Sequence, residues 1–252
     1  MKALAVCPTY GRLPYLGRML SSFMEQTYDD KHLVVINDDK NIQILCDDKN
    51  VTVINCNKRI SIGEKRNIGI ALGHYDVIFP WDDDDIFLPH RIANHMEQYK
   101  DKDVRAYRNF SSYILLNNTF TSSNGGLNSL SYLKDEWFAV GGYKSKLLCG
   151  EDAELYNKLN GFKTERNDNK RDFVYCFSTS NYHASSNNPK NIEEVAHEQL
   201  EKMNLVGKKF YINGDIEEYN KYVNLHFLFE KRKKDLMIKH LGDGKIDITH
   251  LL

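Results

Sequence analysis

The amino-acid sequence predicts an α/β fold: a mostly parallel central sheet flanked by helices, with a helical segment at the C-terminal end. In the first third of the chain, short apolar runs alternate with amphipathic stretches, which is the pattern of β-α-β units. After residue 190 the apolar residues recur at helical spacing. The composition agrees, since 41% hydrophobic and 27% charged residues are typical of a globular protein and exclude a disordered or collagen-like chain.

Charge and cysteine content exclude several other classes. The 252 residues carry a formal net charge of −1, which provides no general basic surface for nucleic acid. The five cysteines are odd in number and form no C-x-x-C pair, so neither a disulfide framework nor a zinc ribbon is expected. No run approaches the roughly 18 apolar residues of a membrane span. We therefore expect a soluble protein of the reducing cytoplasm.

Four strands, the first of them buried, and two helices are expected in the first hundred residues. The strands are the apolar runs Ala3–Cys7, Leu33–Ile36, Val51–Ile54 and Val77–Trp81. Pro8 is expected to end the first of them. Leu16–Met24 is expected to be a helix because its apolar residues lie at i, i+4, i+7 and i+8. Ile62–Leu72 is expected to be a second helix, which Gly73 ends.

The remainder of the chain is less regular. Tyr107–Leu116 is expected to be either a strand pair or one long strand, and Glu151–Leu159 a short helix. Asn124-Gly125-Gly126 is interpreted as a turn, with an acceptor-side loop as the alternative. Two amphipathic helices are expected in the final quarter, so we divide the chain into a core over residues 1–189 and a helical extension over residues 190–252.

Polar residues follow three of the expected strands, at the edge where the carboxyl ends of parallel strands meet and ligands bind. They are Pro8-Thr9-Tyr10, Asp38-Asp39 and the run Asp82–Asp85. Four adjacent carboxylates repel one another, and a divalent cation would relieve that cost. Carboxylates without cysteine or clustered histidine favour Mg²⁺ or Mn²⁺, which also bind substrate phosphates. We therefore expect a metal–diphosphate site here, with a solvated acidic turn as the alternative.

Other phosphate and metal motifs do not fit. Ile86 and Phe87 occupy positions at which an EF-hand needs an oxygen ligand and a glycine. The sequence contains no P-loop, no dinucleotide-binding glycine motif and no nucleophile elbow. A P-loop ATPase and a Rossmann dehydrogenase are therefore not expected.

Six motifs in the same order resemble family 2 glycosyltransferases, which have the GT-A fold. They are Val6–Arg12; Ser21-Ser22 with Gln26–Tyr28; Val34–Asp39; Gly63 with Arg66-Asn67 and Gly69; Asp82–Pro89; and Gly141–Tyr143 with Gly150–Asp152. The resemblance covers about residues 3–160 and is specific for fold and reaction class, while it says little about the acceptor. It implies a nucleotide-sugar-binding half over residues 1–100 and an acceptor-side half over residues 101–189.

The resemblance implies a role for each matching side chain of the nucleotide site. Tyr10 would stack on the base beside Pro8, and Asp39 would accept a hydrogen bond from uracil. Arg66 would face the diphosphate, and Asp82 would contact the ribose or a metal-bound water. The same site would also include Arg12, Asp38 and Asp83.

The resemblance further implies the metal site and the catalytic base. Asp84 would be the main ligand of Mn²⁺ or Mg²⁺, and His183 would complete the site, with a purely structural histidine as the alternative. Asp152 would be the base, with Glu151 beside it; the alternative is that both acids only cap the short helix. The metal would stabilise the leaving diphosphate while Asp152 deprotonates the acceptor hydroxyl. We thus expect an inverting, metal-dependent glycosyltransferase that uses a UDP-sugar.

The acceptor is open between two classes. A saccharide is the family's commonest acceptor and our first expectation. A hydroxymethylated base in DNA is the second, which the basic run Lys231–Lys234 would suit if it is more than a solvated helix end. A non-catalytic sugar-nucleotide binding module is the alternative of another class, and the two complete sets of acids argue against it. A nucleotidyltransferase would need a basic, glycine-rich loop that Gly11-Arg12 alone does not supply.

Overall fold

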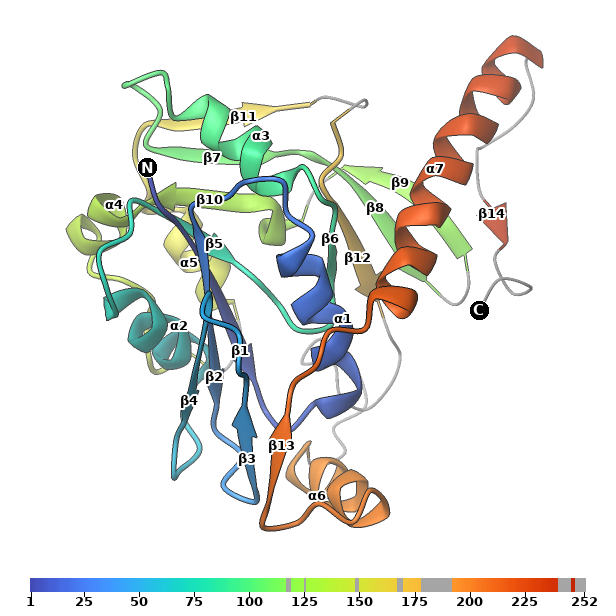
Figure 1. Ribbon diagram of the computed structural model, residues 1–252. Helices are drawn as coiled ribbons and strands as arrows, with labels where there is room; N and C mark the ends of the chain where they lie inside the picture. The colour runs from blue at the N-terminus through green and yellow to red at the C-terminus, as the bar shows by residue number, and fades with distance from the viewer. Residues whose placement is uncertain are drawn as a thin grey trace.

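A large sheet with helices on both faces stands beside a smaller sheet that a long C-terminal helix crosses (Figure 1). The computed structural model describes residues 1–116, 119–124, 126–147, 150–166, 170–177, 192–239 and 246–247. Within these ranges, none of the helices combines the length and the apolar character that crossing a membrane requires.

The large sheet is mostly parallel, as the sequence predicts. Its strands within the described residues are, in spatial order, β11 (Phe162–Glu165), β7 (Ala106–Asn109), β10 (Leu130–Leu133), β5 (Val77–Pro80), β1 (Ala3–Thr9), β2 (Lys31–Asn37) and β4 (Val51–Asn55). β10 runs antiparallel to both of its neighbours, whereas β5, β1, β2 and β4 are parallel. The ends of β1, β2 and β5 therefore meet at one edge.

Alternate side chains of β1 face opposite sides of this sheet, and each side has its own helices. The helices that pack on one side are α1 (Leu13–Met24), α3 (Arg91–Gln98) and α6 (Ile192–Lys202), and those on the other are α2 (Ile62–Ala71), α4 (Lys134–Ala139) and α5 (Glu151–Tyr156). Ala3, Ala5 and Cys7 belong to the first core, and Leu4 and Val6 to the second.

α2 lies very close to the sheet at Gly69. A Cβ atom at this position would lie 2.6 Å from Val6 Cγ1 and 2.9 Å from Ile36 Cδ1, so only glycine fits. The close approach brings the first half of α2, with Lys65 and Arg66, over the carboxyl ends of β1 and β2.

The smaller sheet adjoins the acidic run that follows β5. Among the described residues its strands are, in order, β14 (Ile246–Asp247), β9 (Thr119–Asn124), β8 (Ser111–Leu116), β12 (Phe173–Phe177) and β6 (Ile86–Phe87). The 3₁₀ turn η1 (Leu127–Ser129) leads from β9 to β10. α7 (Ile216–Lys239) packs on this sheet and on α1, and it buries Tyr219, Tyr222 and Leu225 (Figure 1).

The C-terminal segment contains the two predicted helices and also unpredicted strands. β13 (Lys208–Tyr211) pairs in parallel with β3 (Ile42–Leu45), which lies in the first quarter of the chain. Leu200 and Ile212 belong to the same hydrophobic core as α1. Residues after 190 are therefore tied closely to the N-terminal third.

Several boundaries differ from the expectation for local reasons. β1 continues through Pro8 to Thr9, because the proline nitrogen faces β5, whose pairing with β1 ends at Val6. α1 begins earlier than expected, and Pro14 in its first turn favours that start. The expected short helix at Glu151 ends at Tyr156.

Two further expectations are resolved. Tyr107–Leu116 forms two strands, β7 and β8, which belong to different sheets. In the expected turn, Asn124 ends β9 and Gly126 has a φ of 101°, while Gly125 lies outside the described residues.

Candidate active site

The carboxyl end of β1 presents an aromatic ring to the edge of the sheet. Tyr10 and its neighbour Pro8 are both partly exposed. The Arg59 guanidinium lies 3.7 Å from the centroid of the Tyr10 ring. Burial, and then the charge of Asp39, raise the pKa of the Tyr10 phenol. Arg59 thus covers one face of the ring that is expected to stack on a nucleotide base.

Asp38, at the end of β2, is held in place by groups from α2 and the loop before it. Its Oδ1 accepts a hydrogen bond from Lys65 Nζ at 2.6 Å, and its Oδ2 accepts one from the backbone N–H of Ile60 at 2.9 Å. Lys65 also donates to the carbonyl oxygen of Thr9 at 2.9 Å. Asp38 therefore fastens β1, β2 and α2 together.

Asp39 has one satisfied and one unsatisfied carboxylate oxygen. Its Oδ1 accepts hydrogen bonds from the backbone and side-chain amides of Asn41 at 2.9 and 3.0 Å. Its Oδ2 is buried and has no hydrogen-bond partner among the described residues. A Cβ atom at Gly11, whose φ is 58°, would lie 2.4 Å from this oxygen, so glycine keeps the space open. A buried acceptor of this kind suits an N–H group of a ligand.

The four aspartates after β5 alternate in exposure. The side chains of Asp82 and Asp84 are 23% and 15% exposed, whereas Asp83 is 2% exposed and Asp85 is buried as well. Asp83 accepts a hydrogen bond from the last residue of β1 at 2.7 Å, and Asp85 accepts one from the backbone of β12 at 3.1 Å. The inward pair thus fixes the loop, and the other pair is partly exposed and ion-paired with Arg66 and Arg12.

This acidic loop has the donor set of a divalent-cation site. Burial, and then the charge of Asp84, raise the pKa of Asp83 to about 6. A bound cation relieves such crowding, and carboxylate oxygens suit Mg²⁺ or Mn²⁺. No three His, Cys, Asp or Glu side chains form a complete metal cage in the part of the chain that the structure describes. The loop therefore fits a cation that takes its other ligands from water and substrate phosphate.

Two neighbouring arginines hold the outer side of the loop. Arg12 Nη1 lies 2.9 Å from Asp83 Oδ1, and its Nη2 lies 2.5 Å from Asp84 Oδ2. Arg18 donates from Nη2 to the backbone carbonyl of Asp84 and from Nη1 to the hydroxyl of Tyr222, both at 2.9 Å. The acidic loop is thereby connected to α1 and α7.

Arg66 connects the acidic loop to α5. Its Nη2 lies 2.8 Å from Asp82 Oδ1, and its Nη1 lies 2.5 Å from Glu151 Oε1. Asp152 follows in the same helix, and among the described residues its one hydrogen bond comes from the backbone N–H of Ala153 at 2.7 Å. Glu151 is thus ion-paired with Arg66, whereas Asp152 has no ion pair among the described residues.

Asn67 clamps the segment that precedes α5. Its Nδ2 donates to the carbonyl oxygen of Tyr143 at 2.7 Å, and its Oδ1 accepts from the backbone N–H of Tyr143 and from Trp137 Nε1 at 2.9 and 3.1 Å. A Cβ atom at Gly142 would lie 2.8 Å from Asn67 Oδ1. The Arg-Asn pair and the Gly-Gly-Tyr motif therefore form one contact surface.

The residues predicted for the site converge at this edge, with one exception. The converging residues are Pro8, Tyr10, Arg12, Asp38, Asp39, Arg66, Asp82, Asp83, Asp84, Glu151 and Asp152. His183 lies outside the described residues. Arg66 contacts two carboxylates, where the resemblance implied a diphosphate. Sequence reasoning missed Lys65 and Arg59; the signal for Lys65 is its place directly before the Arg-Asn pair.

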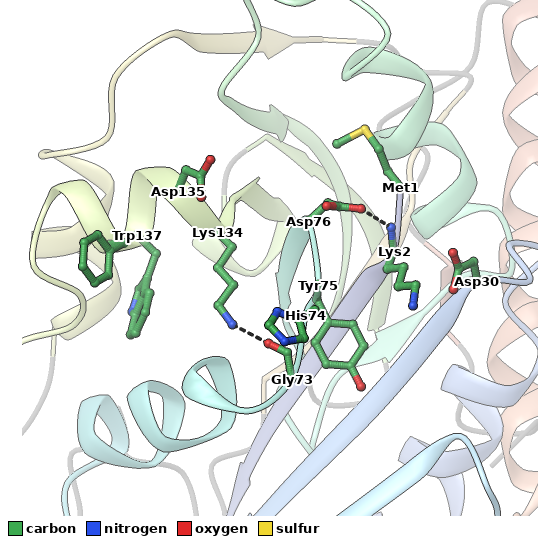
Figure 2. Close-up of a pocket in the computed structure, with 11 residues that line it drawn as sticks. Met1, Lys2, Asp30, Gly73, His74, Tyr75, Asp76, Lys134, Asp135 and Trp137 are labelled. Carbon is green, nitrogen blue, oxygen red and sulfur yellow. Dashed lines mark hydrogen bonds between the residues drawn. The ribbon is translucent and has the colours of Figure 1, made fainter.

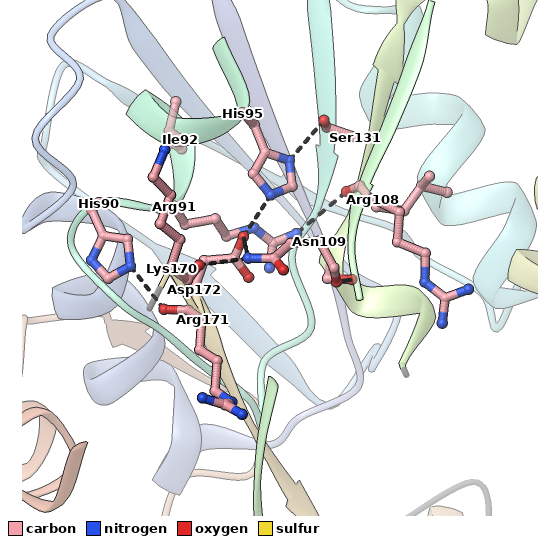
Figure 3. A network of polar contacts seen from close by, with 12 residues as sticks. His90, Arg91, Ile92, His95, Arg108, Asn109, Ser131, Lys170, Arg171 and Asp172 are labelled. Carbon is pink, nitrogen blue, oxygen red and sulfur yellow. Dashed lines mark hydrogen bonds and ion pairs between the residues drawn. The ribbon is translucent and has the colours of Figure 1, made fainter. Parts of the chain in front are cut away.

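A second group of acid–base side chains lies in the core (Figure 3). His95 Nδ1 lies 2.8 Å from Ser131 Oγ, and its Nε2 lies 2.7 Å from Asp172 Oδ2. These are the residue types of a catalytic triad, but all three side chains are completely buried. Burial lowers the pKa of His95, so the imidazole is neutral at pH 7. The group joins α3, β10 and the start of β12 and has no access for a substrate.

A cavity of about 610 Å³ lies at the opposite edge of the large sheet (Figure 2). It is lined by Met1 and Lys2, by residues 73–76 and by part of α4. β1 and β5 begin beside it, so it lies at the amino ends of the strands. It is separate from the carboxylates described above.

The profile of the family described as Glycosyl transferase family 2 matches residues 5–144. The chain belongs to glycosyltransferase family 2. The matched segment includes the ends of β1, β2 and β5 and the whole acidic loop, and it ends shortly before α5. No curated protein matches this chain significantly.

The fold of this family 2 glycosyltransferase is GT-A, as similar solved structures show. S. aureus TarS 1–349 in complex with UDP-GlcNAc has a TM-score of 0.60 and 15% identity, over 77% of this chain and 64% of that chain. Mannosyltransferase PcManGT from Pyrobaculum calidifontis, in complex with GDP-Man and Mn²⁺, has a TM-score of 0.51 and 11% identity, over 71% of this chain and 57% of that chain. The chain spans less than two thirds of the length of these proteins.

Proposed function

We propose that this family 2 glycosyltransferase transfers a sugar from a UDP-sugar to an acceptor hydroxyl, with a divalent cation and with inversion at the anomeric carbon. The observation that carries the proposal is the double contact of Arg66. One guanidinium binds Asp82 of the acidic loop and Glu151 of α5 at 2.8 and 2.5 Å. The expected metal site and the expected base, Asp152, are thereby neighbours.

The donor site of this proposal is the space between Tyr10 and Asp39. The buried Asp39 Oδ2 lacks a partner among the described residues, and the imide N–H of uracil is a matching donor. The Tyr10 ring is partly exposed and covered on one face by Arg59, and it supplies its other face for stacking. Two solved TarS structures are complexes with UDP-GlcNAc and with UDP, and the PcManGT structure is a complex with GDP-Man, so a nucleotide panel is the proper test.

The chain's contribution to metal chemistry is the orientation of Asp82 and Asp84. Because Asp83 and Asp85 are anchored inward, the other two carboxylates point outward at the strand ends. A cation at Asp84, either Mn²⁺ or Mg²⁺, supplies Lewis-acid stabilisation of the leaving diphosphate.

Asp152 is the base of the proposed reaction. It accepts the proton of the acceptor hydroxyl, while Glu151 remains paired with Arg66. One base and one displacement invert the anomeric centre. In this proposal residues 1–100 bind the nucleotide sugar, residues 101–189 face the acceptor and residues 190–252 form the extension. The described cysteines are free, which suits a cytoplasmic location.

Thermal unfolding with UDP, GDP, CDP, ADP and dTDP, each with Mn²⁺ or with EDTA, tests the donor. We expect stabilisation by UDP that needs the metal, because ligand at 100 times its Kd adds about 2.7 kcal/mol. For Asp84→Asn we expect UDP to give no stabilisation, whether Mn²⁺ or EDTA is present. Sugar transfer by Asp84→Asn in excess EDTA would refute the proposed metal dependence.

The acceptor is tested with a radiolabelled UDP-sugar offered to oligosaccharides and to duplex DNA containing hydroxymethylated bases. We propose a saccharide acceptor, so label should enter the oligosaccharides. The anomeric configuration of the product, measured by NMR, should be opposite to that of the donor. Label in the DNA would replace the saccharide proposal, and retained configuration would contradict a single displacement.

A further inference from the structure

Arg66 and Arg12, which both pair with carboxylates of the acidic loop, differ in how firmly they are held. Arg66 is buried, bridges two separate elements, and its guanidinium carbon lies 5.4 Å from the centroid of the Tyr143 ring. Replacing one of its partners would leave a buried charge in the core, which is costly. Arg66 is therefore a permanent clamp.

Arg12 is held by a weaker set of constraints. Its side chain is 17% exposed, and both of its ion-pair partners, Asp83 and Asp84, are consecutive residues of one loop. It follows Gly11, whose left-handed backbone turns the chain out of β1. Its Nε, like that of Arg66, has no hydrogen-bond partner among the described residues, and its guanidinium carbon lies 5.2 Å from the centroid of the Tyr15 ring. Asp83 would keep its hydrogen bond from Thr9 if Arg12 moved away.

We propose that Arg12 is an exchangeable counterion of the acidic loop, which a divalent cation displaces when the nucleotide diphosphate arrives. The guanidinium binds the same Asp84 carboxylate that, under the proposed function on which this inference rests, binds the metal. Two cations on one carboxylate repel each other, so metal and Arg12 compete.

The competition makes metal and nucleotide bind cooperatively. A metal ion that binds alone must break the Arg12 ion pairs and leaves the guanidinium without an anion. When the diphosphate is present, the released guanidinium has a new anionic partner, so less free energy is lost. By linkage, the nucleotide raises the metal affinity by the same factor as the metal raises the nucleotide affinity.

The test is Mn²⁺ binding to the full chain, followed by the EPR signal of free Mn²⁺, with and without UDP. Arg12→Gln removes the competing charge and keeps a polar side chain. We expect it to bind Mn²⁺ alone at least tenfold more tightly than wild type, with a correspondingly smaller effect of UDP on the Mn²⁺ affinity. Lys102→Gln, at an exposed lysine, is the control for the loss of one positive charge and should behave as wild type.

The outcomes separate this inference from the proposed function. If wild type binds no Mn²⁺ even with UDP, the proposed metal-dependent donor site is wrong. If wild type binds both and Arg12→Gln binds Mn²⁺ alone no more tightly, the exchange is refuted while the proposed function stands. Arg12→Lys keeps the positive charge but cannot pair with Asp83 and Asp84 at once, so its affinity for Mn²⁺ alone should lie between those of wild type and Arg12→Gln. It is the variant to use if Arg12→Gln does not fold. Misfolding of both variants would make Arg12 structural and would also overturn the inference.

Discussion

At the residue scale, Asp39 gives a direct test of base recognition. Asp39→Asn would keep a carbonyl for Asn41 and turn an N–H group toward the space beside Gly11, where a uracil N–H would meet a donor. We expect UDP binding to weaken by about tenfold or more, since an unpaired polar group costs 1–3 kcal/mol. Isothermal titration calorimetry measures the Kd of UDP for both proteins. Asp47→Asn, an exposed site with the same charge change, should bind as wild type, and equal affinities would refute the role of Asp39.

Asp152 tests the assignment of the base. Asp152→Asn removes the proton acceptor without touching Arg66, so we expect turnover to fall by about 10²–10⁴-fold. Binding of UDP with Mn²⁺, measured by titration, should stay within about twofold of wild type. Asp135→Asn, at an exposed site on α4, is the matched control. Near-normal turnover of Asp152→Asn would assign the base elsewhere.

The gathering of these residues at one edge could be predicted, but their pairing could not. Carboxylates directly after apolar strands indicate a ligand edge, and that pattern points to Asp38-Asp39 and Asp82–Asp85. The individual roles of Asp39 and Asp84 come from the family resemblance and stay predictions. The ion pairs of Arg12 and Arg66 join residues far apart in the chain, and only packing decides them. The role of Arg59 has no sequence signal, because its contact with Tyr10 depends on the path of a loop.

At the scale of elements, the buried group around His95 holds α3 to β10 and β12 (Figure 3). Burial lowers the pKa of His95, so the unfolded chain takes up a proton near pH 6.5 while the folded chain does not. This histidine therefore contributes less stability as pH falls through that value.

The variant His95→Gln tests this contribution. At pH 7.5 we expect it to be less stable by about 1–3 kcal/mol, because buried partners lose hydrogen bonds. The difference from wild type should shrink toward pH 5.5, since glutamine does not titrate. Urea unfolding at both pH values measures the free energies of unfolding. A difference that grows on acidification would contradict a neutral His95.

The elements found from the sequence are those with continuous apolar runs. β1, β2 and β5 are largely buried strands of this kind, and α1 and α2 follow from spacing and a glycine stop. β4 is an apolar run at the edge of the sheet, where Val51 is its buried residue. β3 and β13 have four residues each, and their partners lie more than 150 positions apart, so no local pattern predicts them. β7 and β8 are adjacent in sequence but separate at Phe110, where the chain passes between sheets.

At the scale of the whole molecule, the C-terminal segment is packed into the rest of the chain. Tyr219, Tyr222 and Leu225 are buried. Burial of a large apolar side chain stabilises the folded state by about 2 kcal/mol. Removing residues 190–252 should therefore abolish cooperative folding and not release an independent core. Calorimetry should show one transition for the full chain. A truncated chain that melts at the wild-type temperature would establish the segment as separable.

Gly69 has a genetic consequence. It contacts no expected ligand, yet any side chain there would push α2 away from the sheet, and α2 carries Lys65, Arg66 and Asn67. A screen for inactive alleles should therefore recover substitutions at this glycine together with those at the aspartates. Suppressors of such alleles should arise where Val6 and Ile36 become smaller, because lost volume in the strands would let the helix return.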